Sequence, residues 1–450
     1  MTTYTETIEH LYQMQRRGIR PGLARITSLL AHFDHPERSF KAIHISGTNG
    51  KGSTAAMVAS VLREAGYRVG LYTSPHLLDF SERIQINHDP IPHDEIVRLT
   101  ERLRRKLAQN SPRLSERISF FEFTTGLAFL YFAEQGIDYA VVEVGLGGQF
   151  DATNVVDPLV SSITSIDLDH ECYLGSTLTE IAAEKAGIIK EDVPVVLAAS
   201  QPEVISIIAE TARLKKAPLV SVGKEVSATL SSPQGALPLI DPMKIHYTGL
   251  REYFIELPLL GRHQIENAAT AIGIIESLQT QGLEITENNI VEGLRKIRLS
   301  GRLEVVQQNP LILLDGAHNP AGARMLGAFL SEIDPERDGT HWLITGIMQD
   351  KQIAEMLRPL LPWADSVIAT QPDMERAAPP EEILGIATSI TARQGKSKPR
   401  VTVEGRVTEA VAHVLSRMKP EDTLVITGSF YTIGEAKGTL LGTHPSPTRG

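Results

Sequence analysis

Short apolar runs alternate with helical segments along the first half of the chain. The runs are rich in Val and Ile, and they fall at 40–46, 68–74, 138–145, 159–167, 193–199 and 218–223. Residues 50–67 place Ala, Val and Leu at helical spacing, and residues 120–136 are predicted to form a longer apolar helix. Near-continuous apolar strands separated by helices are typical of a parallel sheet covered on both faces. The first half of the chain is therefore predicted to be an α/β domain.

A different pattern occupies residues 225–260. Turn residues and alternation replace helical spacing there, which predicts a small antiparallel appendage. Helices are predicted again at 263–281 and 286–297. A second series of apolar strands follows, with helices between its members, at 310–318, 341–348, 365–371, 400–405 and 422–429.

The two series of strands predict two α/β domains of unequal size. The predicted boundaries are 1–298 for the first domain, which includes the appendage, and 299–436 for the second. Residues 437–450 are predicted to be a disordered tail. A length of 450 residues also favours more than one domain, because single cores rarely grow so large.

Composition and charge narrow the class of protein. With 42% hydrophobic and 22% charged residues, the composition is that of a globular protein. The net charge of -10 and the absence of a long basic run argue against a nucleic-acid or anionic-membrane surface. The single cysteine, Cys172, excludes an internal disulfide and fits a reducing compartment. The polar N-terminus has no signal-peptide pattern and no apolar run could span a bilayer, so the cytoplasm is the expected location.

A glycine-rich loop, HISGTNGKGST at 44–54, lies between a predicted strand and a predicted helix. The usual phosphate loop has Gly, four residues, then Gly-Lys-Ser/Thr. Here Ile45 stands where the first Gly belongs, and the hydroxyl arrives one residue late, at Ser53. Its three glycines would let backbone N–H groups approach an anion, and Lys51 would add a positive charge. A tight turn with an exposed lysine is the alternative.

Polar residues end two further strands of the first domain. Glu143 closes the apolar run 138–145 and is followed by glycines. A carboxylate at this place commonly holds Mg²⁺, which is the favoured interpretation, and a buried cation partner is the alternative. Asp167, Asp169 and His170 follow the next strand. His170 could be a ligand or an ordinary structural histidine.

The second domain has a comparable polar strand end in the segment DGAHNP. It places Asp315, His318 and Asn319 after the strand at 310–318, where α/β sheets bind ligands. The alternative is that this segment is only a turn, since Asp, Asn and Pro are common in turns. Four more residues have both a functional and a structural interpretation. The structural one is a turn for Ser74, a surface lysine for Lys185, a helix cap for Asn267 and an ion pair for Arg302.

The order and spacing of these segments resemble the folylpolyglutamate synthase/dihydrofolate synthase family, a branch of the Mur-type ATP-dependent ligases. The matching segments occur in the order GTNGKGS, TSPHL, FSERI, EVGLGGQFDATN, EKAGIIK, GRHQ, DGAHNP and GSFYTIGE, between residues 20 and 436. The resemblance implies an α/β protein with a P-loop nucleotide-binding domain built on a parallel sheet, plus a smaller Rossmann-like C-terminal α/β domain.

The resemblance also implies roles for individual residues. Those expected to bind ATP are Thr48, Asn49, Gly50, Lys51, Gly52, Ser53, Asn267, Arg302 and Asp315. The expected Mg²⁺ ligands, for two ions, are Ser74, Glu143 and His170. Lys185 matches a lysine that these ligases carry as a carbamate. The pterin part of the substrate is expected at Phe121, Glu122, Phe150, Asp151 and Ala152, and the incoming glutamate near His318, Ser429 and Tyr431. The expected catalytic residues are Lys51, Lys185 and His318.

The implied activity joins L-glutamate to the carboxylate of dihydropteroate or a reduced folate, through an acyl phosphate made from ATP. The expected partners are these small molecules alone, with no nucleic acid and no membrane, and the expected state is a monomer. Two alternatives remain: a Mur-type ligase acting on a cell-wall precursor, and a P-loop regulatory or mechanical NTPase that needs no glutamate. The second α/β domain argues against the NTPase, and the segments DATN and FFEFTT favour a folate.

Overall fold

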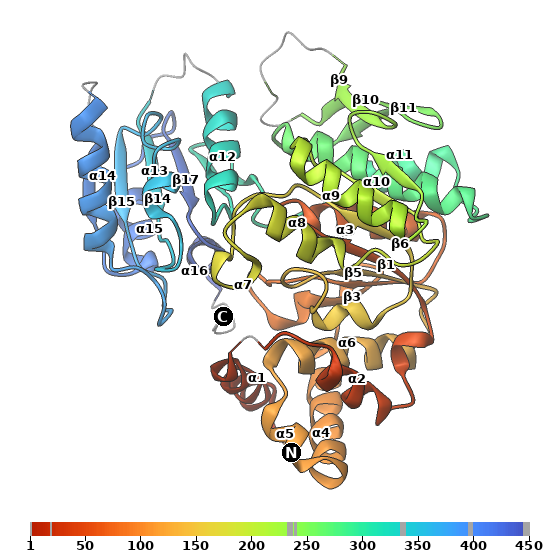
Figure 1. Cartoon of the computed structure of the whole chain (residues 1–450). Helices are drawn as coiled ribbons and strands as arrows, with labels where there is room; N and C mark the ends of the chain where they lie inside the picture. The colour runs from red at the N-terminus through yellow and green to blue at the C-terminus, as the bar shows by residue number, and fades with distance from the viewer. Residues whose placement is uncertain are drawn as a thin grey trace.

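The computed structural model shows two α/β domains side by side (Figure 1). It describes residues 2–18, 20–231, 237, 241–333, 339–394 and 399–443. In Figure 1 the C-terminal domain, in blue, lies beside the N-terminal domain, and helix α12 (Pro320–Glu332) is on the side toward it.

The N-terminal domain is built on an eight-stranded sheet with the order β4-β3-β2-β5-β1-β6-β7-β8. Its strands are β1 (Lys41–Ser46), β2 (Val69–Tyr72), β3 (Ile84–Ile86), β4 (Asp89–Pro90), β5 (Tyr139–Glu143), β6 (Pro158–Ile163), β7 (Val195–Leu197) and β8 (Leu219–Ser221). The six strands from β2 to β8 in this order are parallel, as the apolar runs predict.

The edge of this sheet corrects the prediction of a purely parallel sheet. Strands β3 and β4 pair antiparallel to β2 and to each other. They are joined by Asn87 and His88, both with positive φ. Two such residues form the tight turn that suits the twist of a hairpin. These strands are too short and too polar to give an apolar run, which is why the hydrophobic pattern missed them.

Helices cover both faces of the N-terminal sheet. The helices of this domain are α1 (Tyr4–Gln13), α2 (Ala24–Ala31), α3 (Lys51–Glu64), α4 (His93–Asn110), α5 (Pro112–Arg117), α6 (Phe120–Gln135), α7 (Glu171–Leu174), α8 (Leu178–Ala186), α9 (Pro202–Leu214), α10 (His263–Thr280) and α11 (Glu287–Arg295). Ile43 and Val141 pack on the face with α3 and α10, whereas Ala42 and Val142 pack on the face with α6. Alternate side chains of one strand thus enter different cores, as strand geometry requires.

The predicted appendage is present as a three-stranded antiparallel sheet. Its strands are β9 (Ser227–Leu230), β10 (Met243–Thr248) and β11 (Glu252–Leu257). Part of the predicted segment, 232–236 and 238–240, lies outside the described residues. One face of β10, with Ile245 and Tyr247, packs into the same core as α10.

The C-terminal domain contains a six-stranded sheet with the order β12-β13-β17-β14-β15-β16. Its strands are β12 (Glu304–Gln307), β13 (Leu311–Leu314), β14 (His341–Thr345), β15 (Ser366–Ala369), β16 (Arg400–Val403) and β17 (Thr423–Thr427). Its helices are α12 (Pro320–Glu332), α13 (Ile353–Leu357), α14 (Pro380–Gln394), α15 (Val407–Leu415) and α16 (Phe430–Leu441). All neighbours are parallel except β12 and β13, so the second α/β domain is confirmed.

The C-terminal end of this domain corrects the predicted start of the tail. Helix α16 continues to Leu441 and does not stop at 436. Lys437 is buried and its Nζ lies 2.7 Å from Glu304 Oε1, so the extra turn is tied to strand β12. Residues 444–450 of the predicted tail lie outside the described residues.

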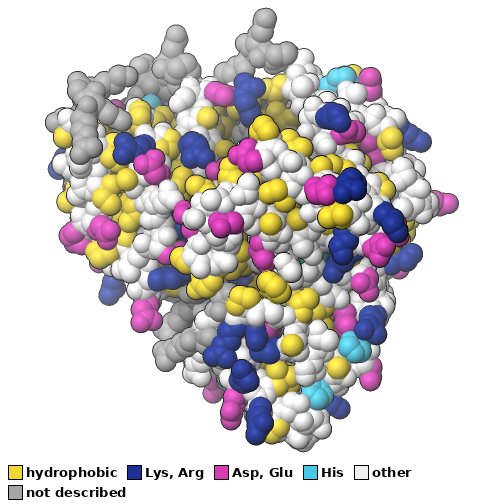
Figure 2. All heavy atoms as spheres, viewed as in Figure 1, with side chains coloured by type: hydrophobic (Ala, Val, Ile, Leu, Met, Phe, Trp, Pro, Cys, Tyr) yellow, Lys and Arg dark blue, Asp and Glu magenta, His cyan; other side chains and the backbone are white. Residues whose placement is uncertain are grey.

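The molecular surface mixes both signs of charge on the face shown in Figure 2. Basic side chains gather over the lower lobe, where α4 lies in Figure 1. Two of the arginines of α4, Arg98 and Arg102, pair with Glu134 of α6. Within the part of the chain that the structure describes, no helix has the length and apolar character needed to cross a bilayer.

Candidate active site

The glycine-rich loop connects the carboxyl end of β1 to the first turn of α3, as predicted. Gly50 is the residue before α3 and has φ 86°. A side chain there would be strained by this left-handed conformation and would also collide with Asn267 of α10. This position therefore requires glycine, and the loop lies between the carboxyl end of β1 and the N-terminus of α3, where a phosphate could be bound.

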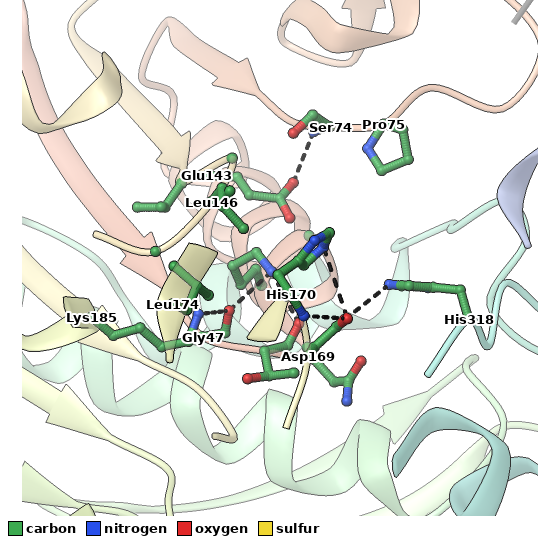
Figure 3. Close-up of a pocket in the computed structure, with 18 of the residues that line it drawn as sticks. Gly47, Ser74, Pro75, Glu143, Leu146, Asp169, His170, Leu174, Lys185 and His318 are labelled. Atoms are coloured by element: carbon green, nitrogen blue, oxygen red, sulfur yellow. Dashed lines mark hydrogen bonds and ion pairs between the residues drawn. The ribbon is translucent and has the colours of Figure 1, made fainter. Parts of the chain in front are cut away.

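A cavity of about 120 Å³ lies between the loop and the C-terminal domain (Figure 3). The N-terminal domain lines it with residues 47–52, Ser74, Glu143, Asp169, His170 and Lys185. The C-terminal domain lines it with Arg302, His318 and Phe430. The structure thus brings together most of the residues predicted to bind phosphate and metal, although they lie far apart in the sequence.

Lys51 folds back onto its own loop. Its Nζ donates hydrogen bonds of 3.0 Å to the carbonyl oxygens of Gly47 and Thr48. Burial lowers the pKa of Lys51, while the nearby carboxylates of Glu143 and Asp169 oppose that shift. The alternative of an exposed lysine on a simple turn is therefore wrong.

The proposed metal ligands Ser74, Glu143 and His170 line the same cavity. Glu143 is 3% exposed, and its Oε2 accepts a 3.0 Å hydrogen bond from the Ser74 N–H (Figure 3). No described residue donates to its Oε1. Burial raises the pKa of Glu143, and Lys51 is the main opposing charge. Burial lowers the pKa of His170 to about 4, which leaves the imidazole neutral and able to coordinate.

This donor set fits a magnesium ion. A carboxylate oxygen without a protein donor, a hydroxyl and a neutral imidazole can hold the ion together with phosphate oxygens and water. Among the described residues, no cluster of three His, Cys, Asp or Glu side chains could hold a metal by itself. The set therefore depends on the hydroxyl of Ser74 and on the nucleotide.

Lys185 is buried at the centre of the site. It is 3% exposed, and its Nζ donates a 2.7 Å hydrogen bond to the carbonyl oxygen of Gly47 (Figure 3). Burial, reinforced by the charge of Lys51, lowers its pKa to about 7. The surface-lysine alternative is wrong, and a large fraction of this amine is neutral near neutral pH.

The side of the cleft expected to receive adenine is narrow. A second cavity, of about 30 Å³, is lined by residues that include Asn267, Arg302 and Asp315. The side-chain amide of Asn267 donates to Gln264 at 3.0 Å. The guanidinium of Arg302 lies 4.6 Å from the ring centroid of Phe430. Asp315 accepts backbone hydrogen bonds from Leu303 and Ala317 and so shapes the wall of this cavity.

His318 faces the first cavity from the C-terminal domain. Its Nδ1 lies 2.8 Å from the Gly316 carbonyl oxygen, which makes Nδ1 the donor and leaves Nε2 as an acceptor. Burial lowers the pKa of His318 to about 4. The residue is therefore neutral, and its Nε2 points toward Asp169 at 3.8 Å (Figure 3).

The residues predicted to hold the pterin line neither of the two cavities. The ring of Phe121 lies against Gly145, which lines the main cavity, and Phe150 is 46% exposed. Ala152 is buried in the short helix that follows Asp151. The Asp151 carboxylate accepts hydrogen bonds from the N–H groups of Leu146 and Thr153.

Three predicted residues use their polar atoms within the fold. Glu122 completes the cap of α6 and pairs with Arg25 at 2.8 Å. Ser429 caps α16, and Tyr431 accepts a hydrogen bond from Arg376. None of the three lines the cavity, although Phe430, between the last two, does. Their contacts with substrate remain predictions.

A group of interdomain contacts was not predicted. Lys351 of the C-terminal domain lies 2.6 Å from Asp169 of the N-terminal domain, and both side chains are buried. Asn319 donates to Asp169 at 3.0 Å and to Asn49 at 3.1 Å. The sequence showed polar residues at both strand ends. Their spacing along the chain carries no information on which of them meet across the cleft.

Family comparisons agree with this architecture. Residues 45–275 match the model of the Mur ligase middle domain, and residues 301–430 match that of the Mur ligase glutamate ligase domain. The chain is 34% identical to the dihydrofolate synthase/folylpolyglutamate synthase of Bacillus subtilis, over 98% of this chain and 99% of that protein. It is 35% identical to the dihydrofolate synthetase of Saccharomyces cerevisiae, over 96% of this chain and all of that protein.

Solved structures give the same result. The structure is similar to Mycobacterium tuberculosis folylpolyglutamate synthase complexed with ADP, with a TM-score of 0.86, 33% identity, and coverage of 98% of this chain and 99% of that one. It is also similar to Escherichia coli FolC in complex with DHPP and ADP, with a TM-score of 0.84, 28% identity, and coverage of 97% and 98%.

Both domains match Mur ligase models, and the phosphate loop of the first domain lines the cleft between them. These features define the protein as a Mur-type ligase. Within that class, the chain belongs to the folylpolyglutamate synthase/dihydrofolate synthase family, because relatives of that name match nearly its whole length. The family and the fold class expected from the sequence are confirmed.

Proposed function

We propose that this protein uses ATP to join L-glutamate to the carboxylate of dihydropteroate, of a reduced folate, or of both. The supporting observation is the cleft itself. The phosphate loop, Glu143 and Lys185 of one domain face Arg302 and His318 of the other across a single cavity. Such an arrangement gathers cations and neutral acceptors where three negatively charged substrates must meet.

The reaction needs activation, since a carboxylate does not condense with an amine at neutral pH. An oxygen of the substrate carboxylate attacks the γ-phosphorus of ATP, and ADP leaves with the electron pair of the broken bond. The glutamate amine then attacks the acyl carbon, and phosphate leaves. Lys51 and Arg302 both line the cavity, and their positive charges would offset the repulsion between the anions.

We propose that Glu143, Ser74 and His170 hold magnesium, and that two ions take part. Magnesium, when bound, supplies positive charge beside the phosphates. A carbamate on Lys185 would add an anionic oxygen ligand at the same place. The pKa of about 7 supports this modification, because only a neutral amine can react with carbon dioxide.

His318 is proposed to bind the incoming amine. Its Nε2 accepts no hydrogen bond from a described residue and faces Asp169 at 3.8 Å beside the cavity, so an amino group bound there can donate a hydrogen bond to Nε2. The low pKa of His318 makes it a weak base, and we therefore assign it orientation and leave the final proton to solvent.

The test of the proposed function is an assay of phosphate release with ATP and magnesium. Release is expected only when L-glutamate and either dihydropteroate or tetrahydrofolate are both present. Comparing the two acceptors shows whether one or both reactions occur. Release without glutamate would favour a P-loop NTPase, and activity only with a cell-wall precursor would favour another Mur-type ligase.

The domains are expected to separate and close during turnover. The two cavities, of about 120 and 30 Å³, are smaller than the roughly 300–1,000 Å³ typical of ligand sites. A nucleotide therefore needs a wider cleft than the one seen here, and closure around it would exclude water from the acyl phosphate. Small-angle scattering should give a different radius of gyration with ATP, folate and glutamate than without them. Superimposable curves would contradict this prediction.

The interdomain ion pair is proposed to hold the closed arrangement. Lys351→Met removes the cation that pairs with Asp169 and should shift the scattering of the unliganded protein toward a more open form. Lys224→Met, which removes an exposed lysine of the N-terminal domain, serves as the control. We also propose that the protein acts as a monomer in the cytoplasm.

A further inference from the structure

Arg83 is a buried cation without a carboxylate partner among the described residues. It is 7% exposed and ends the short helix Phe80–Arg83. No described Asp or Glu lies within ion-pair distance of it, and its two Nη groups donate to no described residue. A buried charge without a partner is costly, so such residues commonly have a ligand to bind.

The acidic residues next to Arg83 in the sequence are already used. Glu82 accepts hydrogen bonds of 2.8 Å from the N–H groups of Leu77, Leu78 and Asp79. Asp79 accepts from the N–H of Ser81 and caps the short helix. Both carboxylates are therefore bonded to backbone N–H groups of this segment, and neither lies within ion-pair distance of the guanidinium.

A hydrogen-bonded chain fixes the orientation of Arg83. Its Nε donates to Nδ1 of His76 at 2.7 Å, so His76 is the acceptor at Nδ1 and carries its proton on Nε2. That Nε2 lies 3.2 Å from the hydroxyl of Tyr12. An imidazole that accepts at Nδ1 is neutral, so His76 adds no second charge beside Arg83.

Aromatic rings surround the guanidinium. Its central carbon lies 5.3 Å from the ring centroid of Phe120 and 5.9 Å from that of Phe80. Phe120 also packs against Tyr12 with ring centroids 5.8 Å apart. The cation is therefore surrounded by aromatic faces. Such surroundings favour a ligand in which an aromatic ring carries an anionic group.

This cluster adjoins the active site. The carbonyl of Arg83 accepts a 3.0 Å hydrogen bond from Thr73, the residue before Ser74, and Ser74 bonds Glu143. Phe120 precedes Phe121, whose ring lies against Gly145 of the main cavity. The Arg83 cluster is thus connected through Thr73 and through Phe121 to residues that line the phosphate cavity.

We propose that Arg83 binds the carboxylate of the acceptor substrate and positions it for phosphorylation, while the benzoyl ring of the same substrate packs near Phe120. The two Nη groups, which donate to no described residue, match the two oxygens of a carboxylate, and His76 and Tyr12 hold the guanidinium in that orientation. This inference rests on the proposed function, because it concerns the same acceptor. It assigns a specificity-determining residue outside the group of residues expected from the sequence.

The test compares two ligands that differ only in the anion. Pteroate carries the carboxylate, and its decarboxylated analogue has hydrogen in its place. The wild-type protein should bind pteroate about 10- to 100-fold more tightly than the analogue, which is the range expected for a charge-assisted hydrogen bond. Arg83→Gln should reduce this ratio to near one without changing the affinity for ATP. Arg83→Lys, which keeps the charge, should recover part of it.

The control is Arg102→Gln, which removes an exposed arginine of α4 and should leave the ratio unchanged. Melting temperatures show whether each variant is folded. If Arg83→Gln is folded and keeps the wild-type ratio, the inference is overturned while the proposed function stands. If the wild-type protein binds neither ligand and makes no product from glutamate, the proposed function itself fails.

A crystal structure of the wild-type protein with pteroate decides the question even if the variants do not fold. The inference expects the pteroate carboxylate within hydrogen-bond distance of the Arg83 Nη groups. A carboxylate bound elsewhere, with Arg83 still unpaired, would overturn it.

Discussion

Lys185→Ala is expected to lower kcat by about 100-fold or more, the range found when a preorganised charged group is removed from an active site. At pH 7 roughly half of the amine is neutral, compared with about one part in 3,000 for an ordinary lysine. This makes Lys185 the residue in the cavity best suited to take up carbon dioxide. Formate or acetate should restore part of the activity, because each can place a carboxylate in the space that the side chain leaves.

The carbamate has a signature independent of activity. Wild-type protein in ¹³C-labelled bicarbonate should show a carbamate carbon resonance that is absent from Lys185→Ala. The resonance should weaken as the pH falls below about 7, because protonation removes the amine lone pair. Lys190→Ala is the matched control, since Lys190 is half-buried, follows Lys185 by five residues and donates a hydrogen bond to the Asn154 carbonyl oxygen. Full activity in Lys185→Ala, with the protein folded, would refute the assignment.

Lys51→Met is expected to lower kcat/KM for ATP by about 100- to 1,000-fold, since the variant loses a charge that faces the transferred phosphate. Among the described residues, the Nζ of Lys51 donates to carbonyl groups of its own loop and to no other group. A nucleotide would offer it stronger anionic partners, so the side chain is expected to turn from the loop to the phosphates. The same change should weaken ADP binding measured by calorimetry.

The control for this variant lies at the other end of the same strand. Lys41 begins β1, is exposed, and has its Nζ 5.9 Å from the ring centroid of Tyr139. Lys41→Met should leave both ATP kinetics and ADP binding close to wild type. An equal loss in both variants would point to a general effect on the sheet, and wild-type behaviour of Lys51→Met would exclude its phosphate-binding role.

Local sequence signals determined most of the fold. The strands of both parallel series were visible because each is a run of Val, Ile and Leu that must be buried on both faces. The phosphate loop was recognisable because its glycines and Lys51 fall between a strand and a helix. The short hairpin β3–β4 and strand β12 were not recognised, because they lie at sheet edges and need little apolar surface.

The residues that act across the cleft could be identified only from the tertiary structure. From the sequence, Lys185 could be an ordinary surface lysine, as lysines usually are, and Arg83 was not singled out at all. Only the packed fold places Lys185 under Gly47 and encloses Arg83 between aromatic rings without a carboxylate partner among the described residues. Burial then lowers the pKa of Lys185.

The sequence by itself determined the fold class, the ligase family and the chemical types available at each strand end, because these depend on local pattern and on the order of motifs. The tertiary structure decided which of those side chains meet, as Lys351 does with Asp169, and which remain unpaired, as Arg83 does among the described residues. The reason is physical. Hydrophobic periodicity is set by neighbours along the chain, whereas desolvation and charge pairing are set by whatever the folded chain brings within a few ångströms.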